Sequence, residues 1–172
     1  KEINHEKGSL INKRVLKVLN NVDKVISNSE FTKNLAINIG VNENKIIVIH
    51  PGVDEIKDIN EKFLKEAQKI LKNKNPKLIT VSRFDKRKNH EKIIMSLRNL
   101  KEIYPNIIYI CIGHGDTLES QKKLIKELKL ESNVLFLKNL SKDEKNSYLK
   151  NSSVFVMPSI SYKKSVEGFG IA

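Results

Sequence analysis

Four cationic side chains lie within six residues, at the point where a short apolar stretch gives way to a helical pattern. Residues 77–82 are apolar enough to form a strand, and Arg83, Lys86, Arg87 and Lys88 follow it directly. A helix that begins after a strand adds free backbone N–H groups and the positive end of its dipole, which favour anions. Arg can grip two phosphate oxygens and Lys supplies a compact charge, so Arg83 and Lys88 suit a diphosphate and the charge it gains on leaving. A cluster of cations by itself is more often a solvated loop. Here its position at the carboxyl end of a predicted strand favours anion binding.

A second candidate is the carboxylate of Glu167, which stands beside glycines in residues 167–171. Such a carboxylate can accept hydrogen bonds from sugar hydroxyls, while exposed backbone N–H groups contact a phosphate. The loop at residues 113–116 is a weaker signal, because Leu118 occupies the third glycine position of the dinucleotide fingerprint. Gly113 then either contacts a phosphate or allows close packing of two backbone segments.

No metal or cofactor site is predicted. The four histidines lack the spacing of metal ligands, and the single Cys111 lies in the apolar run 107–112, where a small buried side chain is expected. Neither a Walker lysine motif nor a nucleophilic serine elbow is present. We therefore expect a protein that needs no metal and no cofactor.

The elements that must position these residues alternate between short apolar runs and amphipathic stretches. This alternation is typical of strand–helix units that form a parallel sheet covered by helices, so the expected fold class is α/β. The expected strands are 24–27, 46–50, 77–82, 107–112, 134–137 and 154–157. The expected helices, with apolar residues at three- and four-residue spacing, are 10–19, 30–39, 61–71, 90–103, 118–128 and 142–149.

Local signals mark the ends of some of these helices. Ser29 and Ser141 each precede acidic residues of a first turn and are expected to be N-caps. Gly40 follows a predicted helix and is expected to be a C-cap, since glycine adopts the left-handed conformation at little cost.

A domain boundary is predicted at the turn formed by residues 51–54, Pro-Gly-Val-Asp, after which the chain is mostly polar. Residues 1–52 hold two helices and two strands, too few for a core of their own, and are expected to be the carboxyl-terminal part of an amino-terminal domain. Residues 53–172 are expected to form a second domain, truncated at its carboxyl-terminal end. The chain has no initiator methionine and stops soon after Glu167, so it is expected to be a fragment of a longer protein.

Composition narrows the class of protein. Apolar residues make up 39% and charged residues 30% of the chain, as in a globular protein, and no apolar stretch approaches the roughly 18 residues of a membrane span. The formal charge of +12 favours anionic partners, and peripheral contact with an anionic membrane is one of them. Aromatic residues are only 6% and do not interleave with basic ones, so no nucleic-acid partner is expected.

The motifs occur in an order that resembles the family 4 retaining glycosyltransferases, also called group 1 glycosyl transferases, of the GT-B fold. The resemblance covers nearly all of the 172 residues. Its most specific parts are Arg83 with Lys88 and the stretch 167–170. The matching segments are 27–32, 51–54, 81–83, 113–115, 133–137 and 158–170.

The resemblance implies two Rossmann-like domains, with helices on both faces of each sheet, that hold a nucleotide-sugar donor and an acceptor. Arg83 and Lys88 would contact the donor diphosphate, and Glu167 would contact the transferred sugar. By the same resemblance, further donor contacts come from Phe169, Gly170, Ile171, Asn139 and Leu140. The glutamate expected to hold the ribose lies eight positions after Glu167, beyond Ala172.

The function that follows from the resemblance is transfer of a hexose from a nucleoside diphosphate sugar to a hydroxyl acceptor (a glycan, lipid or small molecule), with retention of configuration. The proposed catalytic residues are Arg83, Lys88 and Glu167. A cytoplasmic enzyme of glycan biosynthesis is expected, peripheral at the inner membrane face, and this fragment alone is expected to be inactive. Two alternatives stay open: a relative that isomerises or hydrolyses a nucleotide sugar, and a non-catalytic basic module that binds polyanions.

Overall fold

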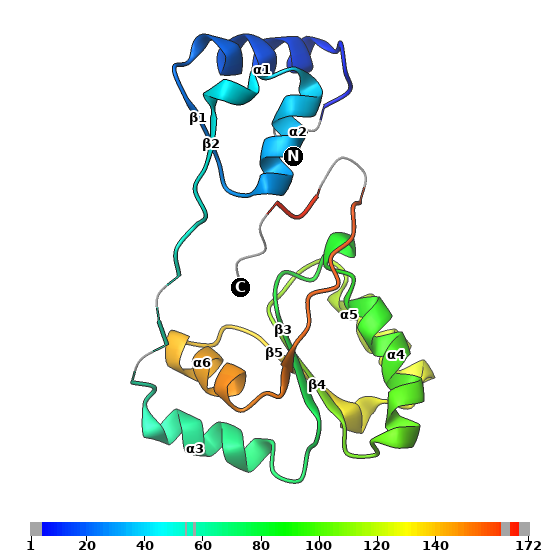
Figure 1. Ribbon diagram of the computed structural model, residues 1–172. Coiled ribbons are helices and arrows are strands. Elements are labelled where there is room, and N and C mark those ends of the chain that lie inside the picture. Colours follow the sequence, from blue (N-terminus) through cyan, green and yellow to red (C-terminus); the bar gives the residue numbers. More distant parts are fainter. Residues whose placement is uncertain (1–4, 54, 57, 163–165, 169–172) are drawn as a thin grey trace. The chain divides into compact units, whose positions relative to one another are not determined.

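The computed structural model describes residues 5–53, 55, 56, 58–162 and 166–168. By their internal contacts the residues divide into two units (Figure 1). The first unit comprises Lys1–Asp54 and Ser161–Ile171, and the second comprises Glu55–Ile160 and Ala172. Each unit is described separately below.

The second unit is built on one parallel sheet, with strand order β5-β4-β3-β6. Its strands are β3 (Lys77–Val81), β4 (Ile108–Ile112), β5 (Val134–Leu137) and β6 (Val154–Phe155). Because neighbouring strands run in the same direction, the carboxyl ends of β3, β4 and β5 meet at one edge of the sheet. The loops that carry the predicted donor contacts of this unit leave the sheet at that edge.

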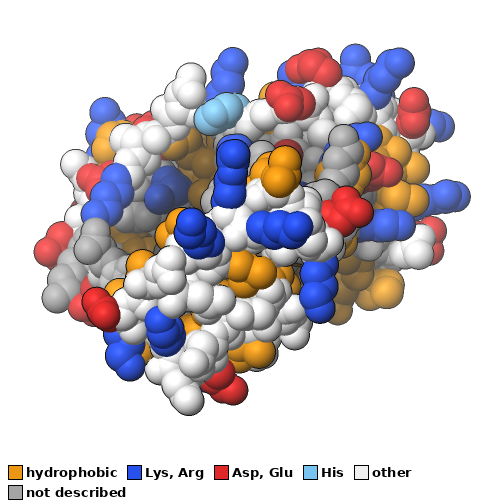
Figure 2. Space-filling view, turned by 90° about the horizontal axis from the view of Figure 1, so that it is seen from above, with side chains coloured by type: hydrophobic (Ala, Val, Ile, Leu, Met, Phe, Trp, Pro, Cys, Tyr) orange, Lys and Arg blue, Asp and Glu red, His pale blue; other side chains and the backbone are white. Residues whose placement is uncertain are grey.

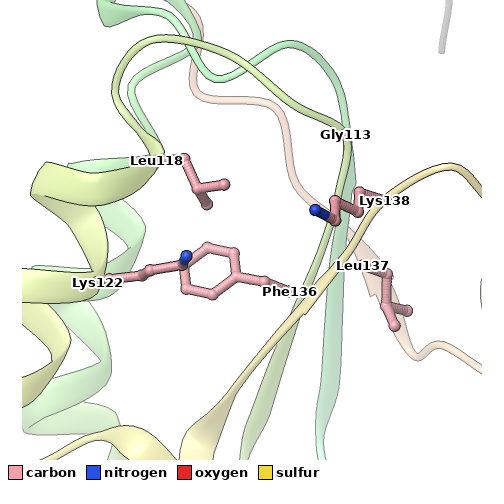
Figure 3. Close-up of a pocket in the computed structure, with 6 residues that line it drawn as sticks. All are labelled: Gly113, Leu118, Lys122, Phe136, Leu137 and Lys138. Atoms are coloured by element: carbon pink, nitrogen blue, oxygen red, sulfur yellow. The ribbon is translucent and has the colours of Figure 1, made fainter.

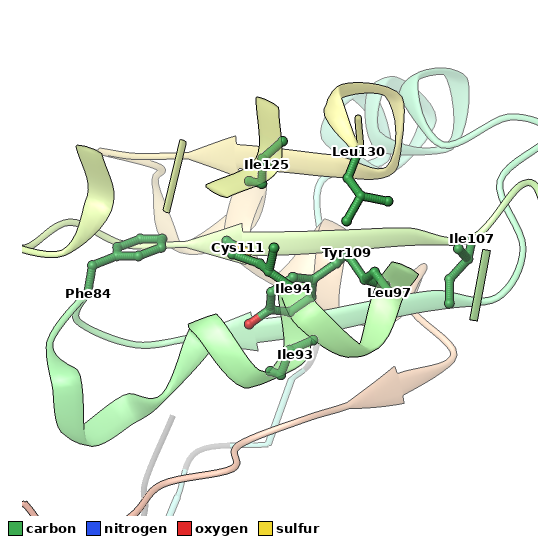
Figure 4. Close-up of a cluster of buried hydrophobic side chains, with 9 residues drawn as sticks. All are labelled: Phe84, Ile93, Ile94, Leu97, Ile107, Tyr109, Cys111, Ile125 and Leu130. Atoms are coloured by element: carbon green, nitrogen blue, oxygen red, sulfur yellow. The ribbon is translucent and has the colours of Figure 1, made fainter. Parts of the chain in front are cut away.

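Helices cover both faces of this sheet (Figure 1). Helices α4 (His90–Ile103) and α5 (Leu118–Glu127) pack on one face, and α3 (Glu61–Ile70) and α6 (Lys142–Lys150) pack on the other. Strand β4 is buried on both sides. Tyr109 and Cys111 face α4 and α5, whereas Ile108, Ile110 and Ile112 face α3 and α6, as alternation along a strand requires (Figure 4).

The first unit contains α1 (Leu10–Asn21), β1 (Val25–Ser27), α2 (Glu30–Ile39) and β2 (Ile46–Val48), and β1 pairs with β2 in parallel. Its small core includes Ala36, Val41 and Ile46. Ile26 and Ile47 are partners in the two strands and are both exposed, so the core covers one face of this two-stranded sheet. The short core agrees with the expectation that few elements are present in this part.

The predicted α/β class is confirmed, and every predicted strand and helix occurs within a few residues of its expected limits. The differences lie at ends: β6 stops at Phe155 and β2 at Val48, since the last residues expected in these strands continue as extended chain. Lys88 lies in a short 3-10 turn, Lys86–Lys88, that precedes α4.

The predicted helix ends are confirmed. The Ser29 side chain accepts a hydrogen bond from the Thr32 N–H, and Ser141 forms a capping box with Glu144. Gly40 has φ 106°, the left-handed conformation expected of a C-cap.

The division into units differs from the expected domain limits in one respect. The sequence places all of residues 53–172 in one domain, whereas Ser161–Ile171 groups with the first unit. The contact behind this grouping is visible at Gly168, whose carbonyl accepts a hydrogen bond from the Ser29 hydroxyl. The expected limits at residues 52 and 53 stay a prediction.

Candidate functional site

An open pocket of about 320 Å³ lies at the carboxyl edge of the sheet in the second unit. Strands β3, β4 and β5 each contribute their last residues or the loop that follows. Four of the predicted donor contacts are among the lining residues, which are Val81, Ser82, Arg83, Ile112, Gly113, His114, Asn139 and Leu140. The structure therefore brings together predicted donor contacts that are up to 57 positions apart, from Arg83 to Leu140.

Backbone hydrogen bonds continue beyond the strands and hold these loops together. The Ser82 N–H donates to the Ile112 carbonyl (3.0 Å), and the Gly113 N–H donates to the Leu137 carbonyl (2.9 Å). One step further, the Phe84 N–H donates to the His114 carbonyl (2.8 Å). The wall of the pocket is thus backbone that hydrogen bonds join from one loop to the next.

Gly113 and Gly115 allow this close approach. A Cβ atom on Gly113 would lie 2.0 Å from the Ser82 carbonyl oxygen, and one on Gly115 would lie 2.4 Å from the Phe84 carbonyl oxygen. Both glycines also have φ near +150°, a backbone conformation that residues with a side chain rarely adopt. The sequence left phosphate contact and close packing open for Gly113; the structure shows close packing, and it also places Gly113 in the pocket wall.

Arg83 stands at the rim of this pocket with its side chain 73% exposed. Its guanidinium lies 3.7 Å from a carboxylate oxygen of Asp85, a weak contact in a solvated place. The guanidinium can therefore turn toward an anion in the pocket at little cost.

Lys88, by contrast, is buried, with 8% of its surface exposed. The Asp85 carboxylate accepts a hydrogen bond from the Lys88 backbone N–H (3.0 Å), and the ammonium nitrogen lies 3.7 Å from the sulfur of Met157. A lysine is rarely buried unless its charge is paired, since desolvation of an ammonium is costly. Lys88 is not among the residues that line the pocket of Arg83.

The turn that carries Lys88 is tied to the chain that follows β6. The Asn89 amide donates to the Pro158 carbonyl (3.2 Å), and the Ile160 N–H donates to the Arg87 carbonyl (2.8 Å). These two contacts hold the cationic segment beside residues 158–160, although the two segments are far apart in the sequence.

Glu167 belongs to the first unit, and Phe169, Gly170 and Ile171 lie outside the described residues. Next to Glu167, the Gly168 backbone packs against the side chains of Asn28 and Thr32. The convergence of Glu167 with Arg83 and Lys88 on one ligand stays a prediction.

A second pocket, of about 200 Å³, was missed by sequence reasoning (Figure 3). It lies between α5 and β5 and shares Gly113 with the first pocket. An apolar wall and two lysines line it: Gly113, Leu118, Lys122, Phe136, Leu137 and Lys138. The Lys122 ammonium also forms an ion pair with the Glu119 carboxylate (2.7 Å). In the sequence, such a pair of opposite charges three residues apart is typical of a solvated helix face.

His90 is fully buried and stacks on Phe84, with ring centroids 4.4 Å apart. Burial lowers the pKa of His90 to about 4, so the imidazole is neutral near pH 7. The sequence indicates only that His90 lacks the spacing of a metal ligand. In the structure, one of its ring nitrogens lies 2.9 Å from the hydroxyl of Ser82, a residue of the pocket wall.

The part of the chain that the structure describes contains no group of three or more His, Cys, Asp or Glu side chains placed to hold a metal ion. Among the described helices, none combines the length and the apolar character needed to cross a membrane.

Comparison with known proteins identifies the family. Residues 61–172 match the family described as Glycosyl transferases group 1, and residues 2–57 match the one described as Glycosyltransferase Family 4. Over 132 residues, 76% of this chain and 34% of the relative, the chain is 30% identical to the N-acetylgalactosamine-N,N'-diacetylbacillosaminyl-diphospho-undecaprenol 4-alpha-N-acetylgalactosaminyltransferase of Campylobacter jejuni. It is also 30% identical, over 81% of its length and 35% of the relative, to an uncharacterized glycosyltransferase of Methanocaldococcus jannaschii.

Solved structures agree on the fold. The crystal structure of HepE from Anabaena in complex with UDP has a TM-score of 0.74 and 19% identity, and covers 88% of this chain and 42% of that one. HepE in complex with UDP-glucose gives a TM-score of 0.71 at 19% identity, over 87% of this chain and 42% of that one. The expected GT-B type of fold is confirmed, and the chain spans about a third of the length of the curated relatives that it matches. With a family match over more than half of its residues, the chain belongs to the group 1 glycosyl transferases.

Proposed function

We propose that the protein to which this chain belongs transfers a hexose from a nucleoside diphosphate sugar to a hydroxyl acceptor, with retention of configuration. The observation that carries this proposal is the pocket at the carboxyl ends of β3, β4 and β5. It unites Arg83, Gly113, Asn139 and Leu140 in a chain of a glycosyltransferase family. Ligands of open α/β sheets bind at this edge.

The donor class is supported by two relatives. HepE, which has the same fold, has been crystallised with UDP and with UDP-glucose, and the Campylobacter relative is named for transfer of N-acetylgalactosamine. We infer that the present protein likewise uses a nucleoside diphosphate sugar, with Asn139 and Leu140 beside the base.

In the proposed mechanism, cleavage of the bond between the sugar and the diphosphate places negative charge on the departing phosphate oxygen. The Arg83 guanidinium and the Lys88 ammonium would stabilise that charge, an effect of about 3–4 kcal/mol for one well-placed donor. Lys88 is suited to this role because a buried ammonium is screened less by water than an exposed one. Glu167 would accept hydrogen bonds from hydroxyls of the transferred sugar, and the backbone of residues 169–171 would complete the contact.

The proposal assigns the stabilisation of the leaving group to protein cations, with no metal ion and no cofactor. Transfer that persists in excess EDTA supports this assignment, and transfer that is lost and then restored by Mg²⁺ contradicts it.

Peripheral contact with an anionic membrane is proposed for α1. Lys13, Arg14 and Lys17 lie on this helix without an acidic residue, and Leu10 and Val18 are 75% and 62% exposed. Figure 2 shows Lys, Arg and hydrophobic side chains on the viewed surface, together with Asp and Glu side chains. Basic and apolar groups together favour the surface of an anionic bilayer, and co-sedimentation with anionic as against neutral vesicles measures the contact.

The test of the proposed function is a binding panel on the intact protein. Nucleoside diphosphate sugars are expected to raise its melting temperature more than free sugars or polyanions do, because the site binds base, diphosphate and sugar together. Binding of DNA, RNA or heparin that is strongly salt-dependent, without any preference for a nucleotide sugar, would instead identify a polyanion-binding module. Product analysis with and without acceptor then separates transfer from isomerisation or hydrolysis.

A further inference from the structure

Asn89 lies between the turn that carries Lys88 and the first residue of α4, in the left-handed backbone conformation. Its φ is 57° and its ψ is 35°. Residues with a side chain rarely adopt this conformation, and Asn is one of the few that do so readily, while Gly does so freely. Glycine would therefore satisfy the backbone here, and the contacts of the side-chain amide show what asparagine adds.

The side chain of Asn89 does not cap the helix that it precedes. An asparagine at this position ordinarily accepts a hydrogen bond from a backbone N–H of the first turn, as Asn42 and Asn60 do at the starts of their own helices. Asn89 forms no such side-chain bond to α4. Its amide donates to the Pro158 carbonyl instead (3.2 Å), 69 positions away in the chain. The side chain thus joins two distant segments.

This bond lies beside the contact between Lys88 and Met157, whose ammonium nitrogen and sulfur are 3.7 Å apart. Asn89 and Pro158 are the next residue of each segment, so the two contacts are adjacent. On the other side of Lys88, its backbone N–H donates to the Asp85 carboxylate (3.0 Å). The backbone at Lys88 is therefore held by one side-chain bond at Lys88 itself and by another at the residue that follows.

Lys88 depends on such contacts because its ammonium stands at the end of a long, flexible stem. The side chain is buried, so the neighbouring chain determines where the ammonium lies. Loss of the Asn89 bond would loosen residues 157–160 from the turn, and the ammonium would lose a fixed place. A misplacement of about 1 Å near a reacting group can lower a rate about a hundredfold.

We propose that Asn89 is a positioning residue: its hydrogen bond to the Pro158 carbonyl fixes Lys88 where the ammonium can stabilise the departing diphosphate. Asn89 acts through Lys88, not through contact with a substrate. This inference rests on the proposed function for the role of Lys88. The contact between the two segments rests on the structure alone.

Asn89→Gly isolates the amide, because glycine keeps the left-handed backbone without strain and removes only the side chain. Asn73→Gly is the matched control. Asn73 also has a positive φ, of 65°, but it precedes β3, at the opposite end of that strand from the turn of Lys88. Both variants make the same replacement in the same backbone conformation, so the difference between them reports the contact with Pro158.

The kinetic test uses the intact protein. Asn89→Gly is expected to lower kcat about tenfold, the size of one hydrogen bond. The KM for the donor should change less, because Lys88 acts most strongly on the charge that develops as the bond to the sugar breaks. Asn73→Gly should keep the wild-type kcat. A wild-type kcat in Asn89→Gly, or an equal loss in both variants, overturns the inference.

A double-mutant cycle shows whether Asn89 acts through Lys88. In the Lys88→Met background, Asn89→Gly is expected to lower kcat no further, because no ammonium is left to position. A second loss as large as that in the wild type would place the effect of Asn89 elsewhere and contradict its role. The same cycle on the Kd of UDP, GDP or ADP, whichever binds the wild type best, serves for variants that are too slow to assay.

The contact itself is tested without any ligand, by amide hydrogen exchange. The Ile160 N–H donates to the Arg87 carbonyl (2.8 Å), close to the Asn89 bond, so it is protected only while the two segments stay together. Asn89→Gly is expected to speed exchange at Ile160, and Asn73→Gly is not. Unchanged exchange in Asn89→Gly refutes the inference. If Lys88→Met keeps wild-type turnover, the proposed role of Lys88 fails instead, while exchange at Ile160 still decides whether Asn89 holds the two segments.

Discussion

A Cβ atom added to Gly113 would lie 2.0 Å from the carbonyl oxygen of Ser82. The loops that follow β3 and β4 therefore meet backbone to backbone, at the place where the pocket needs both of them. We expect Gly113→Ala to destabilise the protein by about 2 kcal/mol or more, because the new methyl group clashes and φ of +148° is strained for alanine.

The measurement is the melting temperature of the intact protein, beside that of Gly52→Ala. Gly52 has no atom within 4 Å of its Cβ position and no positive φ, so its substitution is expected to be nearly neutral. Equal melting temperatures for Gly113→Ala and the wild type would contradict the close packing.

Arg83→Ala is expected to reduce turnover by about a hundredfold or more, because the diphosphate loses one stabilising donor. The side chain is 73% exposed and its contact with Asp85 is long, so the melting temperature should stay within a degree or two of the wild type. Steady-state kinetics with saturating donor measure the effect, and Arg98→Ala on α4 is the matched control. Near-normal turnover in Arg83→Ala would remove Arg83 from the mechanism.

Lys88→Met separates charge from packing at the other cation. Methionine keeps an unbranched stem of similar length in the buried site, so the packing around the stem should be kept, and the melting temperature checks that the variant still folds. Turnover is nevertheless expected to fall about a hundredfold or more. Lys123→Met, on the surface of α5, should change neither quantity. A variant that keeps wild-type turnover would show that Lys88 is buried for structural reasons alone.

Most of the fold could be predicted from the sequence because β3, β4 and the helices around them have clear apolar periods. Strand β4 is apolar throughout and is buried on both faces, and Arg83 at the end of β3 lines the pocket as its position predicts. These features are local: they depend on residue type and spacing along one segment.

The remainder could not be predicted because it depends on contacts between distant segments. The Thr80 hydroxyl donates a hydrogen bond to the Val156 carbonyl, 76 positions later in the chain, and no periodic pattern in the sequence predicts that contact. Likewise the burial of Lys88 results from the chain after β6, whose Met157 packs against it. From the sequence, Lys122 is an ordinary exposed lysine of α5. In the structure it lines a pocket together with Phe136 of β5.

Glu167→Gln tests the third proposed catalytic residue. The amide keeps one acceptor oxygen but replaces the other with a donor, so hydrogen bonds from sugar hydroxyls should weaken. Transfer is expected to fall about tenfold in kcat/KM, with little change in melting temperature. Glu127→Gln, at the end of α5, is the control. A wild-type rate in Glu167→Gln would leave Glu167 without a role in transfer.

Ser141→Ala removes the N-cap of α6 and is expected to cost about 1 kcal/mol of stability at pH 7. The size of this loss should depend on pH, because hydrogen bonds from the Ser141 hydroxyl and N–H lower the pKa of Glu144 in the folded state. A group with a lowered folded pKa stabilises the protein above its unfolded pKa, and this contribution is lost as the pH falls through the folded value. The difference in melting temperature between wild type and Ser141→Ala should therefore narrow below about pH 4.

A difference that stays constant or widens with acid would contradict the capping box. Ser120→Ala is the control: it removes a hydroxyl from α5 without touching a carboxylate, so its effect on the melting temperature should show no such dependence on pH.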